Sequence, residues 1–323
     1  MAEQGVGARS ASAGQRRSGL TMRRPGIGFI APSGQVLDAT ALDRALGYFK
    51  SHGWRVVCPA AVRRSHQRFA GTDVARAQAL HAMLAHDEVD VVMAVRGGYG
   101  MSRLLDRVDY KLIAASKKIL VGHSDFTALN AALYAQTRAI SYGGPTAIYD
   151  FGTEQISAFT EAHFFALLHA PKHRIEMRAS NPYRLNLTGK IWGGNLAMIA
   201  HLAGTPYLPR IRNGILYVED INEHPYRIER MIYQLHHAGM LKRQQALVLG
   251  DFSAYQLLPN DNGFNFDAMV DHLRERLEIP VITGLPFGHC RDKITIPFGA
   301  RARLDVTRSG LALELSEYPY LGT

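Results

Sequence analysis

The sequence predicts an α/β protein in which a doubly wound parallel sheet precedes a second, mixed α/β region. Three observations favour this fold. Strand-like and helix-like segments alternate from residue 27 onward, several expected strands are apolar throughout, and short alternating runs gather near the C-terminus. Uniformly apolar strands are typical of parallel sheets that helices cover on both faces. The length of 323 residues corresponds to about two domains at roughly 150 residues each.

The N-terminal half alternates between strands and helices with short connections. Its first strand, in the run IGFIAPSG from Ile27, ends in a Pro/Gly turn. The helices are expected where apolar residues recur every three or four positions, as at Leu42, Ala45 and Phe49. Together these elements predict a flavodoxin-like doubly wound sheet. The strands are expected at 27–34 (with its turn), 54–59, 89–95 and 117–122, and the helices at 38–50, 73–86 and 124–135.

The C-terminal half is expected to be mixed α/β with a barrel-like or layered strand core. Residues 171–187 lose the periodicity and contain two prolines, so they are predicted to be a linker. The resulting domains are a tail at 1–24, an N-terminal α/β domain at 25–170 and a C-terminal domain at 188–323. In the last, helices are expected at 195–203, 226–238 and 265–277, strands at 214–220 and 246–252, and antiparallel strands between 293 and 315.

Composition and charge exclude several classes of protein. The net charge is +9, but residues 1–24 hold five Arg and one Glu, so the rest of the chain is only mildly basic. We expect these residues to form a disordered basic tail, and we expect no nucleic-acid partner. No apolar run approaches the ~18 residues that a membrane helix needs. Cys58 and Cys290 are the only cysteines, too few for a disulfide framework and consistent with a reducing compartment.

Two loops follow expected buried strands and carry unusual residues. The first is RGGYG at 96–100, whose glycines permit close approach of a ligand to backbone N–H groups. It lacks the G-x-G-x-x-G and Walker patterns, so a nucleotide site is not expected. A tight strand-to-helix turn explains the same glycines equally well.

The second loop is GHSDF at 122–126, which places Ser124 between a buried strand and a helix. This position lifts a serine oxygen above the sheet edge, and it leaves the N–H of Asp125 at a helix N-terminus. A nucleophilic serine needs such a place, with a donor ready for the oxyanion. The alternative is that Ser124 only caps the helix.

A serine nucleophile also needs a base and an acid that orients the base. His289 ends the turn-rich segment GLPFGH, and Glu219 ends the apolar strand GILYVED, so these two are the candidates. Asp220 is the competing carboxylate, but neighbouring strand residues point to opposite faces. Cys290 is excluded as a partner of His289 for the same reason. Neither H-E-x-x-H nor paired C-x-x-C occurs, so we expect no metal and no cofactor.

Five motifs in order now become recognisable. They are RGGYG, GHSDFTAL, GGN at 193–195, YVEDINEHPYRIER and GLPFGH. This series resembles the LD-carboxypeptidase family, the serine peptidases that include murein tetrapeptide carboxypeptidases and the microcin-immunity hydrolases. The resemblance runs from about Gly26 to Leu315. One departure is His123, where the family has an aromatic residue before the serine.

The resemblance implies roles for particular residues. Ser124 would be the nucleophile, with Glu219 and His289 completing the triad. The backbone N–H groups of Gly98 and Asp125 would form the oxyanion hole. It further implies a cytoplasmic homodimer without a cofactor, which releases D-Ala from murein tetrapeptides in peptidoglycan recycling. Substrate-binding candidates are Arg96 and Arg291, whose guanidinium groups can hold a carboxylate, together with Tyr99.

Two other functions stay open at this point. The protein could hydrolyse peptidyl- or aminoacyl-nucleotides, as the microcin-immunity branch does. That chemistry needs an aromatic platform for a base, for which Trp192 is a candidate. The fold could also bind cell-wall peptides without cleaving them.

Overall fold

The computed structural model describes residues 23–322. The tail expected at 1–24 therefore lies almost wholly outside the described residues. The first sheet has six strands in the order β11-β5-β4-β3-β1-β2, and its first five strands along the chain run parallel to one another. The order β2-β1-β3-β4-β5 is that of doubly wound sheets of the flavodoxin type. These strands are β1 (Gly26–Ile30), β2 (Arg55–Val57), β3 (Val91–Ala94), β4 (Ile119–Gly122), β5 (Tyr142–Gly143) and β11 (Ile296–Pro297).

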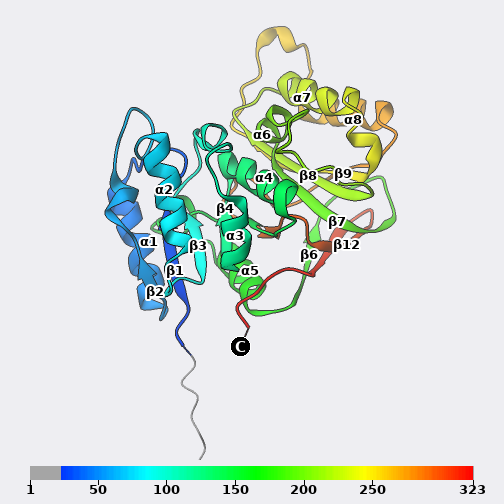
Figure 1. Cartoon of the computed structure of the whole chain (residues 1–323). Coiled ribbons are helices and arrows are strands. Elements are labelled where there is room, and N and C mark those ends of the chain that lie inside the picture. The colour runs from blue at the N-terminus through cyan, green and yellow to red at the C-terminus, as the bar shows by residue number, and fades with distance from the viewer. Residues whose placement is uncertain (1–22, 323) are drawn as a thin grey trace, which may run out of the picture.

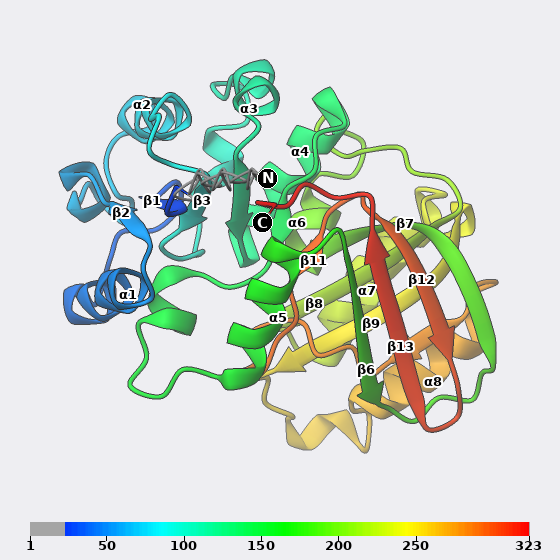
Figure 2. The ribbon, with the colours of Figure 1, turned by 90° about the horizontal axis from the view of Figure 1, so that it is seen from below.

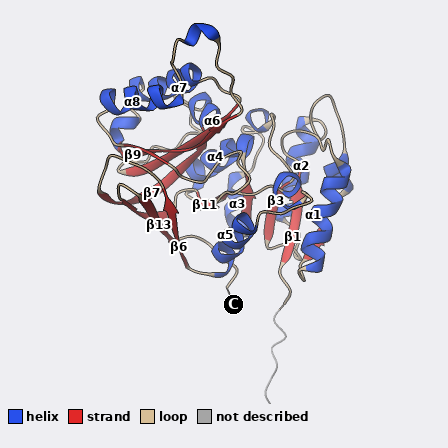
Figure 3. Cartoon of the chain, turned by 180° about the vertical axis from the view of Figure 1, so that it is seen from behind, coloured by secondary structure: helices blue, strands red, loops and turns tan. Residues whose placement is uncertain are grey.

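Helices cover both faces of the first sheet (Figures 1 and 3). Alternate residues along a strand belong to two different hydrophobic cores, one on each face of the sheet. Val91 and Met93 belong to the core that holds the apolar side of α1, whereas Val92 and Ala94 belong to the core that holds the apolar side of α2. This two-sided burial explains why the strands are apolar throughout. The helices are α1 (Ala39–Ser51), α2 (Asp73–Leu84), α3 (Tyr110–Ser116), α4 (Thr127–Thr137) and α5 (Ala158–His169).

The second sheet is open and mixed, not barrel-like. Its order is β10-β9-β8-β7-β12-β13-β6, with β10 and β6 at the two edges. The expected barrel-like core is therefore wrong, because β10 and β6 do not pair with each other. The strands are β6 (Lys172–Arg178), β7 (Leu185–Asn195), β8 (Gly214–Ile221), β9 (Gln244–Ser253), β10 (Val281–Thr283), β12 (Arg301–Val306) and β13 (Gly310–Ser316).

Most of the segment predicted as a linker, 171–187, belongs to this sheet. Strand β6 pairs antiparallel with β13 along its full length, and β7 begins at Leu185. Figure 2 shows β6, β13 and β12 side by side, with α5 alongside β6. The helical periodicity is absent there because β6 is a strand with one exposed face, in which only Ile175 is fully buried.

Strand β7 joins the two parts of this sheet. Residues 185–190 pair antiparallel with β12 and alternate between partly buried and exposed positions, whereas 191–195 pair parallel with β8 and are all buried. The buried half is covered by helices, which lie together on one side of β8 and β9 (Figure 1). These helices are α6 (Leu196–His201), α7 (Pro225–His237) and α8 (Phe266–Arg276).

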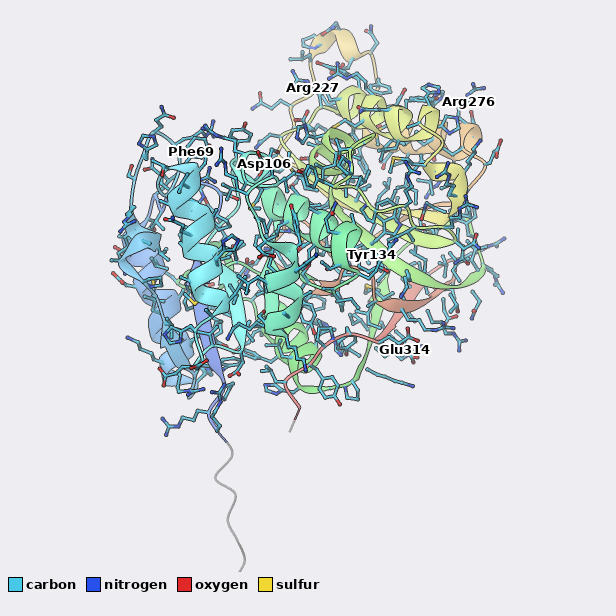
Figure 4. All side chains as sticks on the ribbon, in the orientation of Figure 1. Phe69, Asp106, Tyr134, Arg227, Arg276 and Glu314 are labelled. Atoms are coloured by element: carbon cyan, nitrogen blue, oxygen red, sulfur yellow. The ribbon has the colours of Figure 1, made fainter. Side chains whose placement is uncertain are left out.

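The two halves of the molecule pack directly against each other. Strand β11 comes from the C-terminal half but pairs with β5 in the first sheet. Tyr134, labelled in Figure 4 on α4 where it meets the second sheet, packs against Phe298 with ring centroids 5.8 Å apart. Sites can therefore form from residues of both halves. Among the helices described, none combines the length and apolar character that a membrane crossing requires.

Candidate active site

Ser124 lies at the sharp turn between β4 and α4. Its φ is +62°, in the left-handed region that non-glycine residues rarely adopt. Gly122 makes this turn possible, because a Cβ there would lie 2.4 Å from the ring of Phe126. The turn holds Ser124 at the carboxyl end of the parallel sheet, where open α/β sheets bind ligands.

The side chain of Asp125 anchors this turn to two neighbouring loops. Its Oδ2 accepts hydrogen bonds from Ser33 Oγ at 2.6 Å and from the Met101 backbone N–H at 2.8 Å. Burial is the main cause that raises the pKa of Asp125. The loops that follow β1, β3 and β4 are thereby tied together beneath Ser124.

The glycine-rich loop packs directly against the serine. A Cβ on Gly97 would lie 2.7 Å from Ser124 Cβ and 3.0 Å from its Oγ, so no larger residue fits. Gly98 has φ +107°, which also favours glycine. Within residues 23–322, neither the N–H of Gly98 nor that of Asp125 donates to a protein acceptor. Both remain available to a ligand.

Glu219 lies on β8 and is fully buried, with an exposed fraction of 0%. Nδ1 of His289 lies 2.8 Å from its Oε2, and Asn195 Nδ2 donates to its Oε1 at 3.3 Å. A buried carboxylate needs such partners to offset its lost hydration. Because an ionised carboxylate only accepts hydrogen bonds, Nδ1 of His289 carries the proton and Nε2 of the neutral ring is free to act as a base.

Asp220, the competing carboxylate, contacts Asn195 and the start of α6 and makes no hydrogen bond to His289 in the described structure. Its carboxylate accepts hydrogen bonds from Asn195 Nδ2 at 3.0 Å and from the Ala197 N–H in the first turn of α6 at 2.9 Å. Burial, followed by the nearby charge of Glu219, raises the pKa of Asp220 to about 6. Asp220 therefore stabilises the start of α6 and does not compete with Glu219 for His289.

A bulge in β9 positions the loop that carries His289. The register between β8 and β9 shifts between Val218 and Asp220, opposite Glu219. At the shift the Asp251 N–H donates to the Phe287 carbonyl at 2.8 Å. Gly288 follows with φ +147°, and a Cβ there would lie 2.7 Å from that of Asp251. This close packing places the loop over Glu219.

Ser124 and His289 line one pocket of about 710 Å³ between the two halves of the molecule. Arg96 and Arg291 also line it, whereas Tyr99 does not. Tyr99 packs instead against Phe69, with ring centroids 5.9 Å apart. In the described chain no hydrogen bond joins Ser124 Oγ to His289. The other lining residues are Gly97, Gly98, His123, Thr146, Tyr149, Asp150, Thr153, Gln155, Ser157, Thr160, Ile221, Asn222, Cys290 and Lys293.

Sequence reasoning missed a buried ion pair in this pocket. The ammonium of Lys293 contacts the carboxylate of Asp150, and both side chains are almost fully buried. Asp150 also accepts a hydrogen bond from the Thr146 N–H at 2.7 Å. No local pattern could have revealed the pair, because its members are 143 positions apart.

Trp192 does not offer a platform for a base. Its exposed fraction is 1%, and its indole Nε1 donates to Gln244 Oε1 at 2.9 Å. Cys290 lines the pocket, but burial is the main cause that raises its pKa to about 11, so its thiol stays protonated near neutral pH.

Comparisons with known proteins identify the family. Residues 27–144 match the LD-carboxypeptidase N-terminal domain, and residues 188–304 match the LD-carboxypeptidase C-terminal domain. The crystal structure of muramoyltetrapeptide carboxypeptidase from Oxalobacter formigenes superposes with a TM-score of 0.87 at 46% identity, covering 91% of this chain and 99% of that one.

Two curated relatives represent two branches. The murein tetrapeptide carboxypeptidase of Pseudomonas aeruginosa is 27% identical over 292 residues, covering 87% of this chain and 94% of the relative. The microcin C7 self-immunity protein MccF of Escherichia coli is 24% identical over 319 residues, covering 89% and 92%. The two domain matches follow each other along the chain and together cover more than half of it, so the chain belongs to the LD-carboxypeptidase family.

Proposed function

We propose that this protein is a serine LD-carboxypeptidase that releases the terminal D-Ala from murein tetrapeptides through an acyl-enzyme. The observation that carries the proposal is the 2.8 Å contact between His289 and the buried Glu219, in a pocket that Ser124 also lines. The 46% identity to a muramoyltetrapeptide carboxypeptidase supports the substrate class.

The proposed mechanism assigns one step to each group. His289 Nε2 takes the proton of Ser124 as its Oγ attacks the amide carbonyl, and Glu219 stabilises the imidazolium that forms. The free N–H groups of Gly98 and Asp125 stabilise the oxyanion, at about 3 kcal/mol for each donor. His289 then protonates the departing D-Ala amine, and water hydrolyses the acyl-enzyme.

The charges that line the pocket suit an acidic peptide. Arg96, Arg291 and Lys293 contribute three cations, of which Lys293 is paired with Asp150. A murein tetrapeptide carries several carboxylates, including that of the terminal D-Ala. A guanidinium binds a carboxylate through two parallel hydrogen bonds, so Arg96 and Arg291 are the proposed anchors. Arg96 is held in place over the ring of Tyr149, 5.6 Å from its centroid.

The family resemblance extends the proposal to a cytoplasmic homodimer that recycles cell-wall peptides. Light scattering coupled to size-exclusion chromatography tests the dimer directly. A mass equal to one chain at micromolar concentration would contradict it.

Mass spectrometry tests the activity. The purified protein is incubated with L-Ala-γ-D-Glu-mDap-D-Ala, and we expect release of D-Ala by the parent protein. Ser124→Ala should lower the rate by about 10³-fold or more. A matched control is Ser116→Ala at the end of α3, which should keep the parent rate. Its hydroxyl donates to the Ile113 carbonyl and accepts from the Lys118 N–H, and Ser116 does not line the pocket. A tetrapeptide that ends in L-Ala should stay intact.

Two other results of this experiment would support the alternative functions. Intact tetrapeptide after prolonged incubation would contradict the proposal and direct the test to aminoacyl-nucleotides. Tight binding of tetrapeptide that is the same in the parent and in Ser124→Ala, without cleavage, would identify a binding protein.

A further inference from the structure

Three potential metal ligands converge beside Ser124. His123, Glu219 and His289 each offer one ligand atom, and these atoms all lie within 4.8 Å of one another. His123 Nε2 lies 3.9 Å from Glu219 Oε2, and the rings of His123 and His289 have centroids 4.6 Å apart. The convergence joins three segments that are distant in sequence, so no spacing motif could reveal it.

A second observation points to a ligand at this place. His123 has an exposed fraction of only 6%, and its Nε2 is buried without a hydrogen-bond partner in the described structure. A buried polar atom without a partner costs about 1–3 kcal/mol, so such atoms are rare unless something else satisfies them. This nitrogen faces the carboxylate of Glu219 at a distance too long for a hydrogen bond.

The placement of the His123 ring suits a metal ligand. Its Nε2 faces the carboxylate of Glu219, and the ring lies beside that of His289. Imidazole binds metal ions through a ring nitrogen that carries a lone pair.

The donor set suits zinc. Two imidazole nitrogens and one carboxylate oxygen are a set that binds Zn²⁺ with a fourth position left open. Tetrahedral zinc at about 2.0–2.2 Å from its ligands keeps the ligand atoms roughly 3.4 Å apart. The observed separations of 2.8 and 3.9 Å lie on either side of this value, and all three ligand atoms lie within 4.8 Å of one another, so movements of roughly 1.5 Å or less suffice.

We propose that His123, Glu219 and His289 form a zinc site, and that zinc bound there inhibits hydrolysis at Ser124. Zn²⁺ takes the lone pair of His289 Nδ1 after the Nδ1 proton has moved, through solvent, to Nε2 of the same ring. Nε2 then carries a proton and can no longer accept the proton of Ser124. The binding depends on the three side chains alone, whereas the inhibition rests on the proposed function.

The site depends on the ring nitrogen of His123. Phe or Tyr at position 123 would leave only two ligands. The proposal therefore predicts that zinc sensitivity is lost when His123 is replaced by either residue.

Zinc binding is measured in the full-length Ser124→Ala variant by competition with a chromogenic zinc chelator. This variant keeps all three ligands and cannot hydrolyse peptide through Ser124. Adding His123→Phe should weaken the affinity for zinc by about 100-fold or more, beyond the ~10–100-fold cost of losing a supporting partner. His123→Gln provides a second test that keeps a polar side chain, and circular dichroism verifies that both variants fold.

Hydrolysis is measured with and without zinc for the parent protein and for each variant. The rate of each protein with zinc is compared with the rate of the same protein without zinc. Zinc should inhibit the parent, EDTA should reverse the inhibition, and Mg²⁺ should have no effect, because it prefers oxygen ligands. His173→Gln is the matched control. It removes another close histidine pair, in which His163 Nδ1 lies 2.8 Å from His173 Nε2, and it should leave zinc inhibition unchanged.

Three results would overturn the proposal. They are equal zinc affinity with and without His123, absence of zinc binding by folded Ser124→Ala, and an increase of the hydrolysis rate on addition of zinc. If the parent hydrolyses no tetrapeptide while Ser124→Ala binds zinc through His123, the binding is supported. In that case the inhibition and the proposed function both fail.

Discussion

The carboxylate of Glu219 and Nδ1 of His289 lie 2.8 Å apart, although 70 positions separate the two residues in the chain. Asn195 holds the other carboxylate oxygen, and the loop that carries His289 is locked onto the bulge in β9. The pair is thus rigidly held on the C-terminal half of the molecule, and it faces the serine of the N-terminal half across the pocket.

Replacing Glu219 by Gln should lower kcat by about 10³–10⁴-fold with little change in KM. The amide keeps the volume, but its NH₂ group favours the wrong tautomer of His289, and its neutral charge no longer stabilises the imidazolium. Steady-state release of D-Ala provides the measurement. Glu223→Gln, which removes only the partly exposed partner of Arg227, is the control and should retain the parent kcat. A Glu219→Gln enzyme within tenfold of the parent would remove Glu219 from the proposed triad.

The left-handed backbone at Ser124 predicts that a side chain at this position destabilises the protein relative to glycine. Ser124→Gly and Ser124→Ala both remove the hydroxyl, but only glycine adopts φ +62° without strain. We therefore expect the glycine variant to be more stable than the alanine variant by about 1 kcal/mol. Urea denaturation measures the difference, and equal stability of the two would show that the turn carries no strain.

The raised pKa of Asp220 predicts a specific pH dependence of stability. Its pKa is about 6 in the folded protein, against an ordinary value of 3.8. The folded state therefore binds the proton more tightly than the unfolded state. The resulting stability is fully present below about pH 4 and is lost as the pH rises through about 6. The difference corresponds to about 3 kcal/mol.

Asp220→Asn should remove this dependence. The free energy of unfolding of the parent minus that of the variant should be larger at pH 4 than at pH 7, because only the parent gains the proton. Urea denaturation at both pH values gives the two differences, in which the contributions of groups that do not interact with Asp220 cancel. A constant difference would contradict the raised pKa.

The buried pair of Asp150 and Lys293 predicts strong coupling. Lys293→Met leaves the carboxylate buried without its cation and should destabilise the protein by about 3–5 kcal/mol. Adding Asp150→Asn should recover most of that loss, since the variant pair no longer carries an uncompensated charge. Denaturation of the single and double variants measures the coupling, and additive losses would exclude it. In the exposed pair of Arg174 and Glu176, Glu176→Gln should cost less than about 0.5 kcal/mol.

Local patterns in the sequence determined the order of most elements and the position of Ser124. Strands such as β3 are buried on both faces, so their residues are apolar throughout. The turn after β4 needs Gly122. Each of these features can be recognised from a few consecutive residues. The alternation of strand side chains also favoured Glu219 over Asp220 as the partner of His289.

Only the tertiary structure decided which distant residues meet. Strand order and the bulge in β9 bring His289 to Glu219. The packing also buries Trp192, which therefore cannot stack on a nucleotide base, and it leaves Tyr99 outside the pocket. Strand order and packing also leave the second sheet open at β10 and β6, and they bring His123 to the same carboxylate. The physical reason is that periodicity and turn chemistry act over a few residues, whereas these contacts depend on how whole strands and loops pack.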